Sequence, residues 1–146
     1  MKKQLITILV GIAFQLNVYA QSNISEKLAI SQILIKQQGA WNKGSIEKYM
    51  SYYWFSDSLQ FIGKKGITYG WQNTLDNYKK SYPDTTAMGQ LTFELNSIDI
   101  LCKNNGFVIG KWFLKREKGK GDLGGCFSLL LKKIKKKWVI VADHSS

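Results

Sequence analysis

The chain ends in Lys137-Trp-Val-Ile-Val-Ala-Asp-His-Ser-Ser146, a run of β-branched and aromatic residues followed by Asp143 and the only histidine of the sequence. This composition is typical of a β-strand. Because successive side chains of a strand point to opposite faces, the apolar residues of this run fall on both faces of the sheet. A sheet that is apolar on both sides needs cover on both, so we expect this strand at the centre of the fold.

Three further strands are expected before it, at about residues 91–102, 107–117 and 123–134. Asn104-Asn105-Gly106 is a strong turn signal, and the glycine-rich stretch 119–125 predicts a flexible hairpin with a bulge at Gly124-Gly125. Together the four strands predict an antiparallel meander. Strict alternation within the second of them places Trp112 on the inner face.

Three amphipathic helices are expected before the meander. Ser25 and Ser45 are suitable N-caps for the first two, which run to about Trp41 and Tyr53. The second helix carries a single buried stripe, formed by Ile46, Tyr49, Met50 and Tyr53. A short hairpin, the third helix and a loop are expected at residues 59–69, 71–82 and 83–90.

The first twenty residues have the features of a signal peptide. Lys2-Lys3 precedes an apolar run of residues 5–16, and Val18-Tyr19-Ala20 supplies the small residues of a cleavage site. Cleavage after Ala20 leaves one domain, residues 21–146, which we expect to be exported to the periplasm or secreted. No later stretch approaches the roughly 18 apolar residues of a spanning helix, so no transmembrane segment is expected in the mature chain.

The net charge is +11, from 21 lysines and arginines against 10 acidic residues. The lysines concentrate at two hairpin tips, which are either simply solvated or bind an anionic polymer or membrane surface. A nucleic-acid partner is not expected for an exported protein. The two cysteines, Cys102 and Cys126, lie at opposite ends of the predicted meander, too far apart to bond. We expect both thiols to be free and mostly buried.

The order of these elements resembles that of the nuclear transport factor 2-like superfamily, over residues 24–146. Four stretches sharpen the resemblance to its exported bacterial SnoaL-like proteins, namely 40–46, Asp57-Ser-Leu-Gln-Phe-Ile-Gly63, Gly66-Ile-Thr-Tyr-Gly-Trp71 and Trp138-Val-Ile-Val-Ala-Asp-His-Ser145. The resemblance implies an α+β, cystatin-like fold in which a cone-shaped curved antiparallel sheet, a short hairpin plus a four-stranded meander, packs on three helices. It also implies a homodimer through the sheet, which agrees with the two-sided final strand.

Members of this superfamily bind small ligands, scaffold partners, or act as isomerases, cyclases and dehydratases, and fold alone does not decide among these roles. We expect a small-molecule-binding domain first, a cofactor-independent isomerase or cyclase second, and a dimeric scaffold without ligand third. One histidine falls far short of a metal ligand set, so neither metal nor cofactor is expected. A pocket for a flat, apolar or aromatic ligand is expected to be lined by Tyr49, Tyr53, Trp54, Tyr69, Trp71 and Trp112.

An isomerase of this type needs an inward base and a tyrosine that stabilises the developing oxyanion. Asp57, which follows an aromatic helix end, and His144, whose reference pKa lies near neutrality, are the two candidate bases. Asp143 and His144 are neighbours in a strand and therefore point to opposite faces. We expect Asp143 to lie on the dimer face or to cap a helix.

Overall fold

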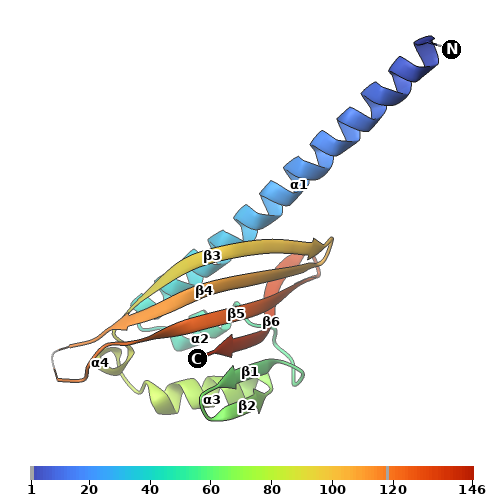
Figure 1. Cartoon of the computed structure of the whole chain (residues 1–146). Helices are drawn as coiled ribbons and strands as arrows, with labels where there is room; N and C mark the ends of the chain where they lie inside the picture. Colours follow the sequence, from blue (N-terminus) through green and yellow to red (C-terminus); the bar gives the residue numbers. More distant parts are fainter. Residues whose placement is uncertain (1, 118) are drawn as a thin grey trace.

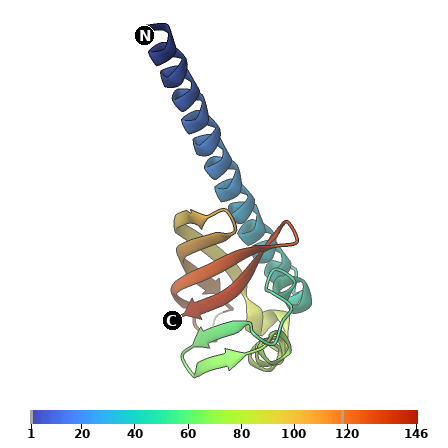
Figure 2. The same cartoon turned by 90° about the vertical axis from the view of Figure 1, so that its right-hand side faces the viewer.

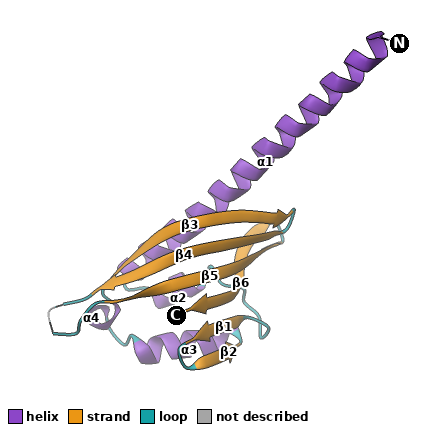
Figure 3. Cartoon of the chain, in the orientation of Figure 1, coloured by secondary structure: helices purple, strands orange, loops and turns teal. Residues whose placement is uncertain are grey.

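The computed structural model describes the backbone of residues 2–117 and 119–146, and the side chains of residues 21, 23–117 and 119–146. Four helices and six strands occur in this part of the chain (Figures 1 and 3). In chain order they are α1 (Lys2–Asn42), α2 (Ile46–Met50), β1 (Gln60–Gly63), β2 (Gly66–Tyr69), α3 (Trp71–Ser81), α4 (Thr85–Met88), β3 (Gln90–Cys102), β4 (Asn105–Lys115), β5 (Leu123–Ile134) and β6 (Lys137–Ser145).

The six strands form one sheet in the order β2-β1-β6-β5-β4-β3. Strands β3 to β6 are an antiparallel meander, and the β1–β2 hairpin joins it through a parallel pairing of β1 with β6. The sheet is not closed, and β6 occupies a central position in it. The α+β class and the meander are therefore confirmed, and the single parallel pairing is an addition to the expected antiparallel sheet.

The helices lie on one side of the sheet, and the core is between the two layers (Figure 2). From α1, the side chains of Ile30 and Leu34 are fully buried or nearly so, and Trp41 is 3% exposed. All four residues of the stripe predicted for the second helix are buried, but α2 ends at Met50, so Tyr53 lies beyond the helix expected to contain it. Trp41 is anchored by its indole Nε1, which donates a 3.1 Å hydrogen bond to the carbonyl of Met88.

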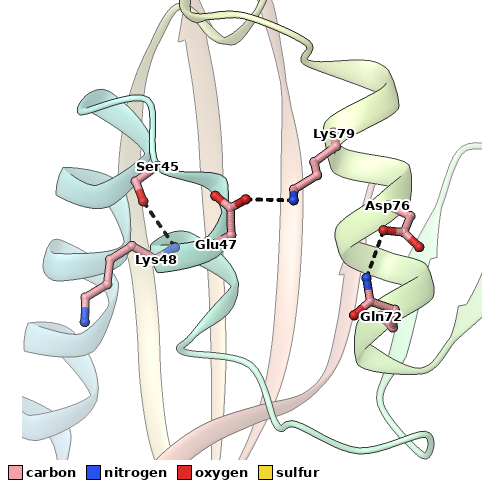
Figure 4. A network of polar contacts seen from close by, with 6 residues as sticks. All are labelled: Ser45, Glu47, Lys48, Gln72, Asp76 and Lys79. Atoms are coloured by element: carbon pink, nitrogen blue, oxygen red, sulfur yellow. Dashed lines mark hydrogen bonds and ion pairs between the residues drawn. The ribbon is translucent and has the colours of Figure 1, made fainter.

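Figure 4 shows polar contacts within α2 and α3 and the ion pair that joins these two helices. The hydroxyl of Ser45 accepts from the backbone N–H of Lys48, so the predicted N-cap is confirmed. Glu47 then forms a 2.7 Å ion pair with Lys79 of α3. Because both side chains are exposed, this ion pair contributes little free energy to the contact between the two helices.

Four expectations about local structure need correction. α1 is continuous from Lys2, so Ser25 does not begin a helix. Asp84 caps the one-turn helix α4 inside the expected loop, with its carboxylate accepting from the N–H of Ala87. The expected bulge at Gly124-Gly125 is absent, because both residues pair in register with β4. Cys102 and Cys126 are free but exposed, at the end of β3 and on the outer face of β5.

The predicted signal peptide falls on residues 1–20, whose side chains lie outside the described part of the chain, so it stays a prediction. Within the described residues, no helix combines the length and apolar content that a membrane span requires.

The inner face of β4 is confirmed, with Val108 and Leu114 buried and Trp112 half-buried, while the intervening residues are exposed. Gly110 lies on this inner face beneath the ring of Phe127. A Cβ at Gly110 would come within 2.5 Å of Cζ of Phe127 and within 2.7 Å of the carbonyl oxygen of Glu94. Only glycine lets β4 pass this close to its neighbours.

Two glycine substitutions should therefore have opposite effects on stability. Gly110→Ala forces an overpacked contact with backbone and should lower the free energy of unfolding by about 1–3 kcal/mol. Gly39→Ala adds a Cβ in α1 with no atom within 4 Å, and should raise it by about 0.5–1 kcal/mol through helix propensity. Urea unfolding measures both, and equal effects of the two substitutions would contradict the packing described.

Candidate functional site

A bulge in β6 decides which side chains face the interior. Leu131 of β5 pairs with Ile140, but the next residue back, Leu130, pairs with Ala142. Val141 is thus an extra residue without a partner in the β5–β6 pairing. One extra residue shifts the alternation of a strand, so every residue after it changes face.

The bulge turns Asp143 into the core. Ile140 is fully buried before the bulge, and strict alternation would bring His144 inward after it. Instead, Asp143 is 3% exposed, whereas His144 is exposed on the outer face. Asp143 and His144 do take opposite faces, but the expectation that Asp143 lies on the dimer face or caps a helix is wrong.

Two hydroxyl groups hold the Asp143 carboxylate. The phenol of Tyr53 donates a 2.6 Å hydrogen bond to Oδ2, and the hydroxyl of Ser145 donates one of 2.8 Å to Oδ1. Tyr53 is fixed beside β6 because its backbone forms a parallel bridge with Ile140. Tyr49 and Tyr53 are four residues apart in the sequence, and their hydroxyl oxygens lie 3.5 Å from each other.

Further aromatic rings surround these hydroxyls. The ring centroid of Tyr78, from α3, lies 5.4 Å from that of Tyr49, and the edge of Phe61 packs on Tyr78 at 5.5 Å. Phe61 also stands opposite Asp143 in the β1–β6 pairing. We call Tyr49, Tyr53, Tyr78, Asp143 and Ser145 the tyrosine–carboxylate cluster; its members come from α2 and the segment after it, α3 and β6.

The cluster changes the acidity of its own members. Burial raises the pKa of Asp143 from 3.8 to about 6, although the hydrogen bonds from Tyr53 and Ser145 act in the opposite direction. Burial, and then the nearby charge of Asp143, raise the pKa of Tyr53 well above its ordinary value. Tyr49 and Tyr78 are shifted the same way. Near neutral pH the tyrosines are therefore proton donors, and Asp143 is close to its own titration range.

This arrangement suits two kinds of chemistry. A carboxyl group that titrates near pH 6 can accept or return a proton at physiological pH, and a neighbouring phenol can donate to an oxygen that gains charge. The same groups can equally serve as hydrogen-bond partners for a polar atom of a bound molecule. Within the described residues, no group of three or more histidine, cysteine or acidic side chains is placed to hold a metal ion.

Trp112 adds an unsatisfied donor on the same inner surface. Its indole Nε1 is buried and has no hydrogen-bond acceptor among the described residues. Trp112 pairs with Gly125 of β5, and Ser145 pairs with Phe127 of that same strand. One strand therefore separates Trp112 from the cluster, which corresponds to about 10 Å across the sheet.

The residues expected to line a pocket divide into three groups. Tyr49 and Tyr53 are buried in the cluster, and Trp112 faces inward beside it. Trp71 packs against Phe55 and donates through Nε1 to the carbonyl of Met50, a structural contact between α3 and α2. The third group, Trp54 and Tyr69, is half-buried or exposed, with Tyr69 57% exposed on β2.

The two candidate bases lie outside the cluster. Asp57 is exposed in the turn before β1, and its carboxylate makes no hydrogen bond or ion pair with any described residue. His144 faces outward, as noted. The structure does not bring either residue together with the tyrosines, and their catalytic roles stay predictions.

Sequence reasoning missed Ser145 and the inward direction of Asp143. The inward direction of Tyr78 had a visible signal, because Tyr78 lies at helical spacing from Trp71 and Leu75 in the third predicted helix. The inward direction of Asp143 had none, because the bulge falls on Val141 inside a uniformly apolar run that contains no glycine.

Comparison with known proteins supports the fold. No protein-family model matches the sequence, and neither does any curated protein. Among solved structures, an NTF2-like protein of unknown function from Shewanella oneidensis MR-1 is 42% identical, covers 81% of this chain and 96% of its own, and superposes with a TM-score of 0.77. An NTF2-like superfamily protein from Salmonella enterica serovar Typhimurium LT2 is 20% identical, with coverages of 82% and 89% and a TM-score of 0.63. A ketosteroid isomerase-like protein from Erwinia carotovora atroseptica SCRI1043 is 15% identical, with coverages of 83% and 95% and a TM-score of 0.65.

The buried carboxyl group should give the protein a specific pH dependence. Because the pKa of Asp143 is raised on folding from 3.8 to about 6, its contribution to stability is full below pH 3.8 and is lost as the pH rises through 6. The loss amounts to about 3 kcal/mol. Asp143→Asn has no carboxyl group to ionise at this position and should not show this loss. The free energy of unfolding of the variant minus that of wild type should therefore increase by about 3 kcal/mol between pH values below 4 and above 6.

Urea unfolding across this pH range measures the effect. Asp57→Asn, which removes an exposed carboxylate without partners, is the matched control and should show no such relative gain. A parallel pH dependence of Asp143→Asn and wild type would show that Asp143 is not buried in this way.

Proposed function

The chain belongs to the nuclear transport factor 2-like superfamily, and we propose that it is a small-molecule-binding domain whose ligand contacts the tyrosine–carboxylate cluster inside the curved sheet. The observation that carries this proposal is the Asp143 carboxyl group, 3% exposed and without a cationic partner among the described residues. Burying an ionisable group in this way costs stability, which favours a functional role for it.

The surroundings of the cluster suggest how a ligand reaches it. The rings of Phe61 and Tyr82 are only half-buried and, with the partly exposed ring of the cluster member Tyr78, form an aromatic rim next to the buried hydroxyls of Tyr49 and Tyr53. A flat, largely apolar molecule can pack against such rings, while a carbonyl or hydroxyl group at its end meets Tyr49 or Tyr53. The unsatisfied Nε1 of Trp112 offers a second polar contact about 10 Å further along the inner face.

The second candidate is an isomerase or cyclase that needs no cofactor. The observation that favours it is the 2.6 Å contact between Tyr53 and a carboxyl group whose pKa is about 6. In this scheme Asp143 would take a proton from carbon next to a carbonyl group, and a cluster tyrosine would donate to the resulting enolate oxygen. A dimeric scaffold without any ligand is the third candidate, and it assigns the cluster no role.

A ligand-binding role predicts that stabilising compounds depend on the cluster. In a thermal-shift screen, planar apolar compounds with a carbonyl or hydroxyl group should raise the melting temperature of the wild type. Tyr53→Phe and Asp143→Asn should weaken the affinity for a hit by about 5–30-fold, as expected for one lost buried hydrogen bond. Tyr69→Phe, on an exposed tyrosine of β2, is the matched control and should leave the affinity unchanged.

The same variants separate the three candidates. Turnover of a hit that disappears in Asp143→Asn but persists in Tyr69→Phe would establish the enzyme. Binding without turnover supports the binding domain. If no compound stabilises the protein, the scaffold remains and the ligand-binding proposal is wrong.

We also propose export and a homodimer through the outer face of the sheet. Export rests on the sequence of residues 1–20, and mass spectrometry of the exported protein tests it, since cleavage leaves Gln21 first.

The dimer rests on apolar side chains that the helices do not cover. Ile109 and Phe113 of β4 are 43% and 44% exposed, and Leu130 and Val139 beside them are half-buried. A second copy placed against this face would cover them.

A charge on the outer face should disrupt the dimer. Ile109→Lys would place an ammonium group in the contact and should weaken self-association roughly tenfold or more. Ile67→Lys is the matched control, because Ile67 is 55% exposed on β2, away from the meander. Sedimentation velocity measures both variants, and a wild type that is monomeric at high concentration would rule out this interface.

A further inference from the structure

Three segments meet at one end of the molecule. The β3–β4 and β5–β6 turns are joined by a 2.9 Å hydrogen bond from the N–H of Lys133 to the carbonyl of Asn104. Glu26 of α1 reaches the same place, since its carboxylate accepts from Nζ of Lys133 and from Nε1 of Trp138. Figure 2 shows both turns near the point where α1 leaves the sheet. We call residues 24–28, 99–104 and 132–137 the basic end.

The basic end carries a large excess of positive charge. It contains two carboxylates, and both are engaged: Asp99 lies 3.7 Å from Lys27, and Glu26 is paired with Lys133. The remaining lysines make no ion pair with any described residue; they are Lys103, Lys132, Lys135, Lys136 and Lys137. Uncompensated charge of one sign attracts a surface of the opposite sign.

The β5–β6 turn keeps two of these lysines in an unfavourable backbone conformation. Lys135 has a φ of 49° and Lys136 a φ of 65°, both in the left-handed region. A two-residue hairpin turn of this kind normally uses asparagine and glycine, because residues with a Cβ are strained there. Lysine is therefore unfavourable at both positions of this turn, which points to a role for the ammonium groups themselves.

Exposed apolar side chains lie among these charges. Ile24 and Leu28, one helical turn apart on α1, are 61% and 59% exposed, and Leu101 at the end of β3 is 60% exposed. Between α1 and β3 is an open groove of about 480 Å³, whose lining includes Ile24, Lys27, Leu28 and Asp99 of the basic end. The basic end therefore offers both lysines and accessible aliphatic groups.

We propose that the basic end docks the protein on an anionic lipid surface. The lysines would lie against headgroup phosphates, and Ile24, Leu28 and Leu101 would enter the boundary between headgroups and acyl chains. The aliphatic residues favour lipid over an anionic polysaccharide or nucleic acid, because those polymers offer no hydrocarbon layer to receive them.

The turn itself supplies the test. Lys135→Asn combined with Lys136→Gly removes two charges and installs the preferred turn residues, so its melting temperature should equal or exceed that of wild type. Its affinity for vesicles containing phosphatidylglycerol, measured by vesicle titration of the mature protein that begins at Gln21, should nevertheless fall roughly tenfold or more. A loss of binding without a loss of stability cannot be attributed to unfolding.

The β1–β2 hairpin offers a matched control, because its tip is also a lysine pair, Lys64-Lys65. β1 runs parallel to β6 and pairs Ile62 with His144, so this tip lies at the opposite end of the molecule from the β5–β6 turn. Lys64→Asn combined with Lys65→Gly removes the same two charges and should leave vesicle affinity within about twofold of wild type.

Three further arms complete the experiment. Binding of wild type should weaken with added salt and be stronger to phosphatidylglycerol vesicles than to phosphatidylcholine vesicles. Leu101→Ser should weaken vesicle binding without changing binding to heparin. The proposal is overturned if the two lysine-pair variants lose affinity equally, if neither loses affinity, or if wild type binds heparin but not anionic vesicles.

Discussion

The extra residue in β6, Val141, is the constraint on which the interior depends. Without it, the alternation of the strand would place His144 in the core and Asp143 outside. With it, the carboxylate of Asp143 enters a space lined by Tyr49 of α2 and by Tyr53 of the segment that follows α2. The parallel bridge between Tyr53 and Ile140 lies just before the bulge and fixes the phenol at the height of the carboxylate.

The electrostatics of the cluster follow from this placement. Burial disfavours the charged form of Asp143, and the Tyr53 and Ser145 hydroxyls recover part of that loss, which leaves the pKa near 6. Burial, and then the negative charge of Asp143, raise the pKa of Tyr53, so its phenol stays protonated. Phenol donors and a carboxylate acceptor thus share one small buried region, and it is on this arrangement that the proposed binding site rests.

Much of the fold was predictable because it depends on local patterns. The buried stripe of α2, the Ser45 cap, the four-stranded meander and the inward face of Trp112 each follow from spacing that any reader of the sequence can count. The site was less predictable, because it depends on which residues of β6 face inward, and β6 is apolar on both faces. In such a run, one extra residue leaves the hydrophobic pattern intact. Asp143 and His144 then exchange faces of the sheet, and no feature of the sequence indicates it.

The central claim is that Asp143 is a buried carboxyl group that titrates near neutral pH inside a ring of tyrosines. Its pKa can be measured directly by following the side-chain carboxyl ¹³C resonance of Asp143 through a pH titration. The midpoint should lie close to pH 6 and should move higher in Tyr53→Phe, because the hydrogen bond from Tyr53 lowers the pKa. A midpoint near 3.8, unchanged by the Tyr53 substitution, would contradict it.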